Sequence, residues 1–167
     1  GILREPWKNI ARADAIIVTK TNLQPPKPFL SMKLNETDIV VFHSKMESII
    51  SPIGYCINSE NATLKNKNIF LFSAIGDPAS FMKSMKNLGA FICGTKEFDD
   101  HYCYSQQDIT IIDQQANKTD AECLVTTEKD WVKIQNFTSV YPIIVVDVHI
   151  MFYNERKLKQ LLQPFIS

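Results

Sequence analysis

The chain has 167 residues, of which 45% are hydrophobic and 22% are charged. These values are typical of a folded domain with a real core, and they exclude a disordered chain. The 18 basic residues equal the 18 acidic residues, so the net charge gives no reason to expect nucleic acid as a partner.

The cysteine pattern gives no indication of a metal site. The four cysteines stand at positions 56, 93, 103 and 123; no pair has CxxC spacing, and no histidine completes a zinc pattern. Buried free thiols in a reducing compartment are the favoured interpretation. The cysteines therefore predict no zinc site in this chain.

The N-terminal third predicts a helix, three strands and a proline-rich connection. Residues 4–13 are expected to form a short helix, and the β-branched run 15–19 a buried strand. Residues 22–30 hold three prolines and predict a loop. A second strand is expected at 38–43 and a weaker one at 48–58.

From residue 68 onward the pattern alternates between strands and helices. Asp77 before Pro78, and Ser105 with Asp108, are typical helix starts. The order strand–helix–strand with short connections indicates right-handed βαβ units. The predicted fold class is therefore α/β, with a mostly parallel, Rossmann-like sheet and helices on both faces. Strands are expected at 68–73, 90–93, 123–126 and 142–148, and helices at 77–88, 105–116, 127–135 and 153–165.

Three polar clusters follow predicted strands, where ligands of open parallel sheets bind. A histidine beside a carboxylate, as at Asp100–His101, can move protons near neutral pH. Lys129 in a first helical turn opposes the helix dipole and predicts a nearby anion such as phosphate. The clusters are Ala74–Ile75–Gly76–Asp77–Pro78, Phe98–Asp99–Asp100–His101 and Thr126–Thr127–Glu128–Lys129–Asp130.

Each cluster also has a purely structural interpretation. Gly76–Asp77–Pro78 is a good helix start without any ligand, and Asp100–His101 could be an exposed loop pair. Residues 126–130 could be a capped helix start. His43 and His149, at the ends of apolar strands, are better explained as structural. The residues alone thus indicate an α/β domain with a cleft of Asp, His, Thr and Lys.

Five stretches, taken in order, carry a further signal. They are residues 1–18, with Leu-Arg-Glu-Pro and Arg-Ala-Asp; 74–81; 88–90; 100–108; and 126–133, with Thr-Thr-Glu-Lys-Asp. Together they resemble the lipid A 4'-kinase (tetraacyldisaccharide 4'-kinase) family, whose motifs GPLREP…RADxxIV, GIGNPxxF, LGA, DHHxFxxxD and TTEKDxVK occur in the same order. The chain departs from the family at three positions. Asp77 stands where the family has the Asn of GIGNP, Asp99 where it has a proline before DHH, and Tyr102 where it has the second His of DHH.

The resemblance implies a P-loop kinase fold. It also implies transfer of the ATP γ-phosphate, with Mg²⁺, to the 4'-hydroxyl of an acylated disaccharide lipid, tetraacyldisaccharide 1-phosphate. The expected location is the cytoplasmic face of the bacterial inner membrane. The site residues it implies are His101 and Asp100 as catalytic residues, and Arg4, Glu5, Gly76, Asp77, Thr126, Thr127, Lys129 and Asp130 as nucleotide- or substrate-binding residues.

The family's phosphate-binding loop, metal ligands and membrane-contacting helix all precede the first matching motif. We therefore expect a C-terminal piece of the enzyme, inactive alone, with ATP and Mg²⁺ bound mainly by a missing N-terminal lobe. Residues 1–21 would join that lobe, 22–37 would be a proline-rich hinge, and 38–167 the C-terminal α/β lobe. The alternative is a non-catalytic α/β binding domain of related fold, which the upstream sequence would distinguish.

Overall fold

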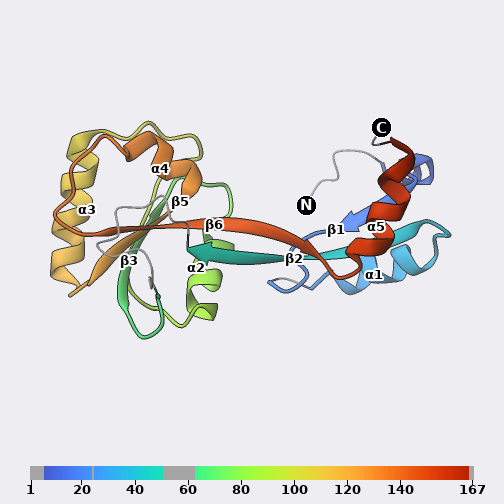
Figure 1. Ribbon diagram of the computed structural model, residues 1–167, viewed down its shortest axis with the longest axis horizontal. Coiled ribbons are helices and arrows are strands. Elements are labelled where there is room, and N and C mark those ends of the chain that lie inside the picture. The colour runs from blue at the N-terminus through green and yellow to red at the C-terminus, as the bar shows by residue number, and fades with distance from the viewer. Residues whose placement is uncertain (1–5, 24, 51–62, 166–167) are drawn as a thin grey trace. The chain divides into compact units, whose positions relative to one another are not determined.

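The computed structural model describes residues 6–23, 25–50 and 63–165 (Figure 1). The chain divides into two compact units, which are described separately. Unit 1 comprises residues 1–47 and 150–167, and unit 2 comprises residues 48–149. Two strands, β2 (Val40–Ile50) and β6 (Ile143–Phe152), each begin in one unit and end in the other. The strand order of the whole sheet is β1-β2-β6-β5-β3-β4.

Unit 1 is built on the parallel pair β1–β2. Ala15 lies opposite Val40 in this pair, and Val18 lies opposite His43. The amide of Tyr153, just after β6, donates a hydrogen bond to the His43 carbonyl at 3.2 Å. The elements confined to this unit are η1 (Trp7–Arg12), β1 (Ala15–Val18), α1 (Pro28–Asn35), α5 (Glu155–Leu162) and η3 (Gln163–Phe165).

Three sequence predictions in the N-terminal part of the chain differ in detail from the structure. Residues 28–30, predicted as loop, begin helix α1, because Pro28 stands at the first helical position, where its missing N–H is not needed. The predicted helix at 4–13 is a 3-10 helix over Trp7–Arg12. The strands expected at 38–43 and 48–58 are one continuous strand up to Ile50, and residues 51–58 lie outside the described part.

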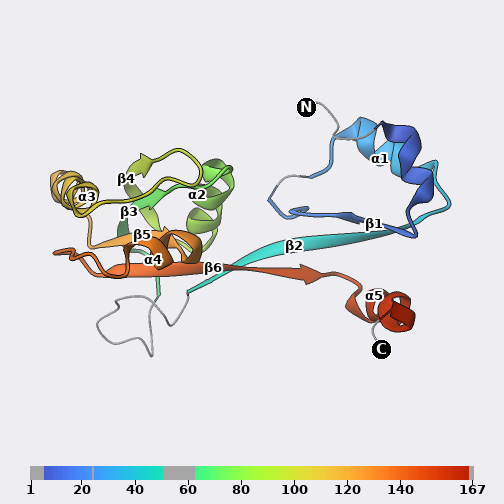
Figure 2. The same ribbon diagram turned by 90° about the horizontal axis from the view of Figure 1, so that it is seen from above.

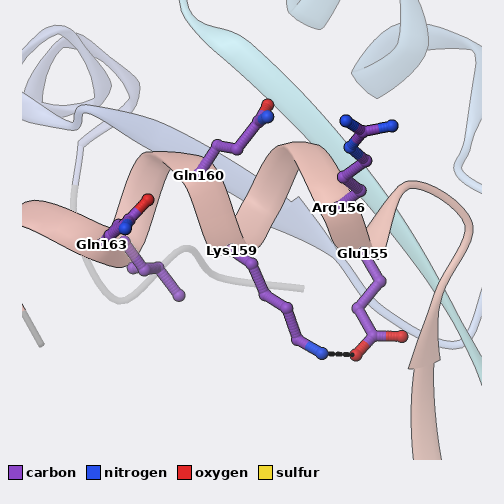
Figure 3. A pocket seen from close by; sticks show the side chains of 6 residues that line it. Glu155, Arg156, Lys159, Gln160 and Gln163 are labelled. Atoms are coloured by element: carbon purple, nitrogen blue, oxygen red, sulfur yellow. Dashed lines mark ion pairs between the residues drawn. The ribbon is translucent and has the colours of Figure 1, made fainter.

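The charged side chains of helix α5 are exposed. A hollow of about 800 Å³ lies along it, and residues of α5 and η3 supply the lining (Figure 3). Within that lining, Lys159 Nζ pairs with Glu155 Oε1 at 2.6 Å. Because a single helix and its extension form the lining, the hollow is a surface groove. None of the helices within the described ranges combines the length and apolar character needed to cross a membrane.

Unit 2 contains a parallel sheet of order β6-β5-β3-β4. Leu71 on β3 lies between Val125 on β5 and Thr95 on β4, and Val125 lies opposite Ile144 on β6. This alternation of parallel strands and helices confirms the α/β fold class. The elements are β3 (Asn68–Ser73), α2 (Pro78–Asn87), β4 (Phe91–Glu97), α3 (Gln106–Lys118), β5 (Cys123–Thr127) and α4 (Glu128–Ile134).

Helices cover both faces of this sheet, as predicted. Side chains of β3 point alternately to the two faces, so that Phe70 and Phe72 join one hydrophobic cluster, and Ile69 and Leu71 the other. Residues of α3 and α4 complete the first cluster, and residues of α2 complete the second. Both clusters lie within residues 64–146, so unit 2 has a core of its own.

Strand β4 approaches β3 unusually closely at one position. The pairing shifts by one residue between Ile69–Ile92 and Phe70–Gly94, which marks a bulge. A Cβ atom at Gly94 would lie 2.6 Å from two carbons of the Phe70 ring. The missing side chain at Gly94 therefore makes room for Phe70 in the core.

Candidate functional site

Three loops meet at the carboxyl edge of the unit 2 sheet, one after each of the neighbouring strands β3, β4 and β5. They are the turn 74–77, the histidine loop 98–104 and the first turn of α4. Lys129 Nζ in α4 lies 3.0 Å from Asp100 Oδ1 in the histidine loop. A Cβ at Gly76 would lie 3.8 Å from Asp100 Oδ2. The prediction that the three polar clusters share one edge is therefore confirmed.

Asp100 is the point at which these loops connect. Its Oδ1 accepts hydrogen bonds from Lys129 Nζ at 3.0 Å and from the His101 amide at 3.0 Å. The hydrogen bond from Lys129 is the main reason that the pKa of Asp100 lies below its ordinary value. The position of Lys129 in the sequence predicted a nearby anion. In this structure that anion is the carboxylate of Asp100.

His101 stands in an unusual backbone conformation with its imidazole in solvent. Its φ is +66°, in the left-handed region that few non-glycine residues adopt, and its side chain is 79% exposed. The imidazole Nε2 lies 3.7 Å from Asp100 Oδ2. Such strained positions gather at functional sites. An exposed imidazole beside a carboxylate at a strand end can accept or donate a proton.

Three aromatic side chains of the histidine loop pack against one another. The ring of Phe98 lies 4.6 Å from that of Tyr102 and 5.0 Å from that of Tyr104, measured between centroids. The Tyr102 hydroxyl donates to Asp108 Oδ1 at 3.2 Å, which attaches the loop to helix α3. Partial burial, followed by the charge of Asp108, raises the pKa of Tyr102. Tyr102 therefore packs as a support for the loop.

Asp130 is fully buried although the sequence grouped it with the binding residues. Its Oδ2 accepts hydrogen bonds from the Ala74 amide and from the Thr127 hydroxyl, both at 2.9 Å. Its Oδ1 lies 3.4 Å from Lys133 Nζ. Burial beside the negative charge of Asp130 raises the pKa of Tyr104 well above its usual range.

The remaining predicted residues occupy different environments. Asp77 is half-buried and caps α2 by accepting a hydrogen bond from the Ser80 amide at 3.1 Å, next to the exposed Gly76. Thr127 caps α4 and is buried, as is Thr126. Arg4 and Glu5 lie outside the described residues.

A second polar group on this edge was not predicted. His149 Nε2 lies 3.0 Å from Asp147 Oδ2, and the charge of Asp147 raises the pKa of Glu128. A hydrogen bond from the Val148 amide chiefly lowers the pKa of Asp147 itself. Asp147 and Glu128 directly follow the paired residues Val146 and Thr127, and no local pattern in the sequence gives that pairing.

The site holds no metal cluster of its own within the described ranges, where no group of three or more His, Cys, Asp and Glu is arranged to bind an ion. The sequence also contains no GxxxxGK[ST] loop. A separate cavity of about 150 Å³ lies at the amino end of β6, away from this edge, and its lining includes Trp131, Phe137, Ser139, Tyr141 and Ile143.

Known proteins resemble this chain along its whole length. A family model described as tetraacyldisaccharide-1-P 4'-kinase (LpxK) matches residues 1–167. A curated tetraacyldisaccharide 4'-kinase of Aquifex aeolicus is 31% identical over 165 residues, covering 97% of the chain and 45% of the relative. A relative of the same name in Rickettsia canadensis is 33% identical over 145 residues, covering 81% of the chain and 44% of the relative. The chain thus spans less than half the length of these relatives.

A solved structure agrees with these matches. It is LpxK from Aquifex aeolicus in complex with ATP, which superposes with a TM-score of 0.62 at 27% sequence identity. The match covers 99% of this chain and 46% of the solved chain. Both the fold and the sequence therefore point to the same group of proteins.

Proposed function

Because the chain belongs to the tetraacyldisaccharide-1-P 4'-kinase family, we propose that it is the C-terminal portion of a lipid A kinase. The intact enzyme transfers the γ-phosphate of ATP to the 4'-hydroxyl of tetraacyldisaccharide 1-phosphate. The observation that carries this proposal is the match of the family model to residues 1–167. The ATP complex of the Aquifex aeolicus protein supports ATP as the phosphate donor.

In this proposal the carboxyl edge of unit 2 faces the reacting groups. His101 orients, or exchanges a proton with, the carboxylate that activates the sugar hydroxyl, and Asp100 holds the histidine loop in place. Lys129 is able to exchange its partner Asp100 for a phosphate oxygen. Gly76 and Asp77 border the same edge, and the buried Thr126 and Thr127 support it from within the fold.

The residues of this chain do not by themselves fit ATP phosphates or Mg²⁺. No phosphate-binding loop occurs in the sequence, and no metal-binding cluster occurs in the part of the chain that the structure describes. We assign both groups mainly to the N-terminal part of the longer enzyme. That part also contacts the inner membrane at its cytoplasmic face, where the acylated lipid substrate is available.

The test is a phosphoryl-transfer assay with radiolabelled ATP and tetraacyldisaccharide 1-phosphate. The longer protein that contains this chain should label the lipid, and residues 1–167 alone should not, because positioning and neutralising the transferred phosphoryl group require the missing loop and metal. Failure of the longer protein to label the lipid would favour the non-catalytic binding domain. Labelling by residues 1–167 alone would contradict the assignment of ATP and Mg²⁺ binding to the N-terminal part of the longer enzyme.

A further inference from the structure

Asp130 is a buried carboxylate to which the proposed chemistry assigns no step. Its exposed fraction is 0%, and a buried charge is costly unless hydrogen bonds and an opposite charge compensate it. The Ala74 amide and the Thr127 hydroxyl both donate to Oδ2 at 2.9 Å, and Lys133 Nζ lies 3.4 Å from Oδ1. Both oxygens therefore have partners within the protein.

These contacts exceed what a helix cap requires. Thr127 is already the N-cap of α4, and its hydroxyl accepts a hydrogen bond from the Asp130 amide at 3.2 Å. The hydrogen bond from Ala74 comes from a residue 56 positions earlier, at the start of the turn 74–77. Asp130 thus ties that turn to α4.

Lys133 extends the same connection to the histidine loop. Its ammonium donates to the backbone carbonyl of Tyr102 at 3.1 Å and lies 5.8 Å from the centroid of the Tyr104 ring. Tyr102 directly follows His101. Since Lys133 also pairs with Asp130, one chain of contacts joins all three loops of the site.

His101 depends on such external support. A non-glycine residue at a φ of +66° persists where its surroundings hold the backbone in place. The imidazole is largely in solvent, so side-chain packing does not fix its direction. The backbone of His101 and Tyr102 must therefore direct the imidazole, and Lys133 holds that backbone at Tyr102.

We propose that Asp130 and Lys133 are positioning residues that hold His101 in place for phosphoryl transfer. They act by fixing the histidine loop to the turn 74–77 and to α4. The catalytic consequence rests on the function proposed above, whereas the effect on the loop does not.

The first experiment measures the loop itself, by hydrogen exchange in the 167-residue chain. Lys133→Met removes the ammonium, and the double variant Asp130→Asn/Lys133→Met removes both charges so that no unpaired charge is left buried. The amides of Phe98 and Tyr102 donate to Ser73 and Asp99 carbonyls at 2.9 and 3.0 Å. Their exchange should become about tenfold faster in both variants, the effect of losing one hydrogen bond to a charged group. Lys118→Met, at the exposed end of α3, should match the wild type.

The second experiment measures kinetics in the longer enzyme. In the double variant kcat should fall by up to about 10²-fold with little change in the KM for ATP, because a displaced catalytic group acts on the transition state. Lys133→Arg keeps a cationic donor and should retain most of the activity. Unchanged loop exchange together with normal kcat in the double variant would overturn the proposal. If the wild-type enzyme does not phosphorylate the lipid, the proposed function fails, and the exchange experiment still decides the role of Asp130 and Lys133.

Discussion

Because the imidazole of His101 is exposed, the effect of a substitution on catalysis can be measured separately from its effect on stability. Replacing it with alanine in the longer enzyme should lower kcat by about 10²–10⁴-fold, the usual contribution of a general acid or base, and raise the KM for ATP far less. Thermal unfolding should hardly change, because the side chain is 79% exposed. Steady-state kinetics and a melting curve measure the two effects.

His43 provides the control for this substitution. It is also exposed, lies in β2 and has no role in the proposed site, so His43→Ala should keep normal turnover. If His101→Ala keeps normal turnover per folded molecule but melts several degrees earlier, His101 has a structural role and the catalytic assignment is wrong.

The Lys129–Asp100 pair makes a prediction about pH. The pKa of Asp100 lies below its ordinary value, so the pair stabilises the fold above that ordinary value, and the contribution is lost as the pH falls through the lower folded-state pKa. Lys129→Met removes the main hydrogen bond, and the pKa of Asp100 should rise toward its ordinary value. An NMR titration of the side-chain carboxyl carbon measures this shift. Lys86→Met, exposed at the end of α2, should leave it unchanged, and an unchanged value in Lys129→Met would show that the pair does not form in solution.

Several site residues could be found from the sequence, but their partners could not. The positions of Gly76, Asp100 and Lys129 after predicted strands were enough to place them on one edge. The pairing of Lys129 with Asp100 joins residues 29 positions apart, and no local pattern encodes it. The burial of Asp130 could not be predicted either. A polar motif shows which polar side chains are present, but not which of them are buried with hydrogen-bond partners inside the protein.

At the scale of single elements, local signals were the most informative. Ser105 and Asp108 predicted a capping box, and the structure contains it: the Asp108 Oδ2 accepts a hydrogen bond from the Ser105 amide at 2.8 Å. The continuation of β4 to Glu97 and of β6 to Phe152 was missed, because strand ends depend on neighbouring strands. Pro28 was taken to interrupt structure where it begins a helix.

The bulge in β4 leads to a prediction about stability. Gly94→Ala would place a Cβ atom 2.6 Å from the Phe70 ring, so either the ring or the strand must move. Overpacking of this kind costs about 1–3 kcal/mol, and the free energy of unfolding measured in urea should fall by that amount. Thr95→Ala, at the next and exposed position, should cost less than about 1 kcal/mol. An equal loss in the two variants would mean that the close contact with Phe70 does not decide the effect.

At the scale of the whole molecule, the two hydrophobic clusters belong to unit 2. A fragment of residues 48–149 should therefore fold alone, with a dispersed NMR spectrum and a single cooperative transition in urea. The lowered pKa of Asp100 should persist in it, because Lys129 lies in the same unit. A fragment that gives no cooperative transition would show that unit 2 depends on unit 1.

The passage of the chain through β2 and back through β6 sets an order of events during synthesis. Residues 48–149, which form unit 2, are synthesised as one uninterrupted stretch before residues 150–167 of unit 1. Unit 1 cannot be completed before unit 2 has been synthesised, because the end of β6 and helix α5 follow unit 2 in the chain. The amide of Tyr153 reaches the His43 carbonyl only after more than a hundred intervening residues have been translated. Strands β1 and β2 are therefore made long before β6, the strand that lies next to β2 in the finished sheet.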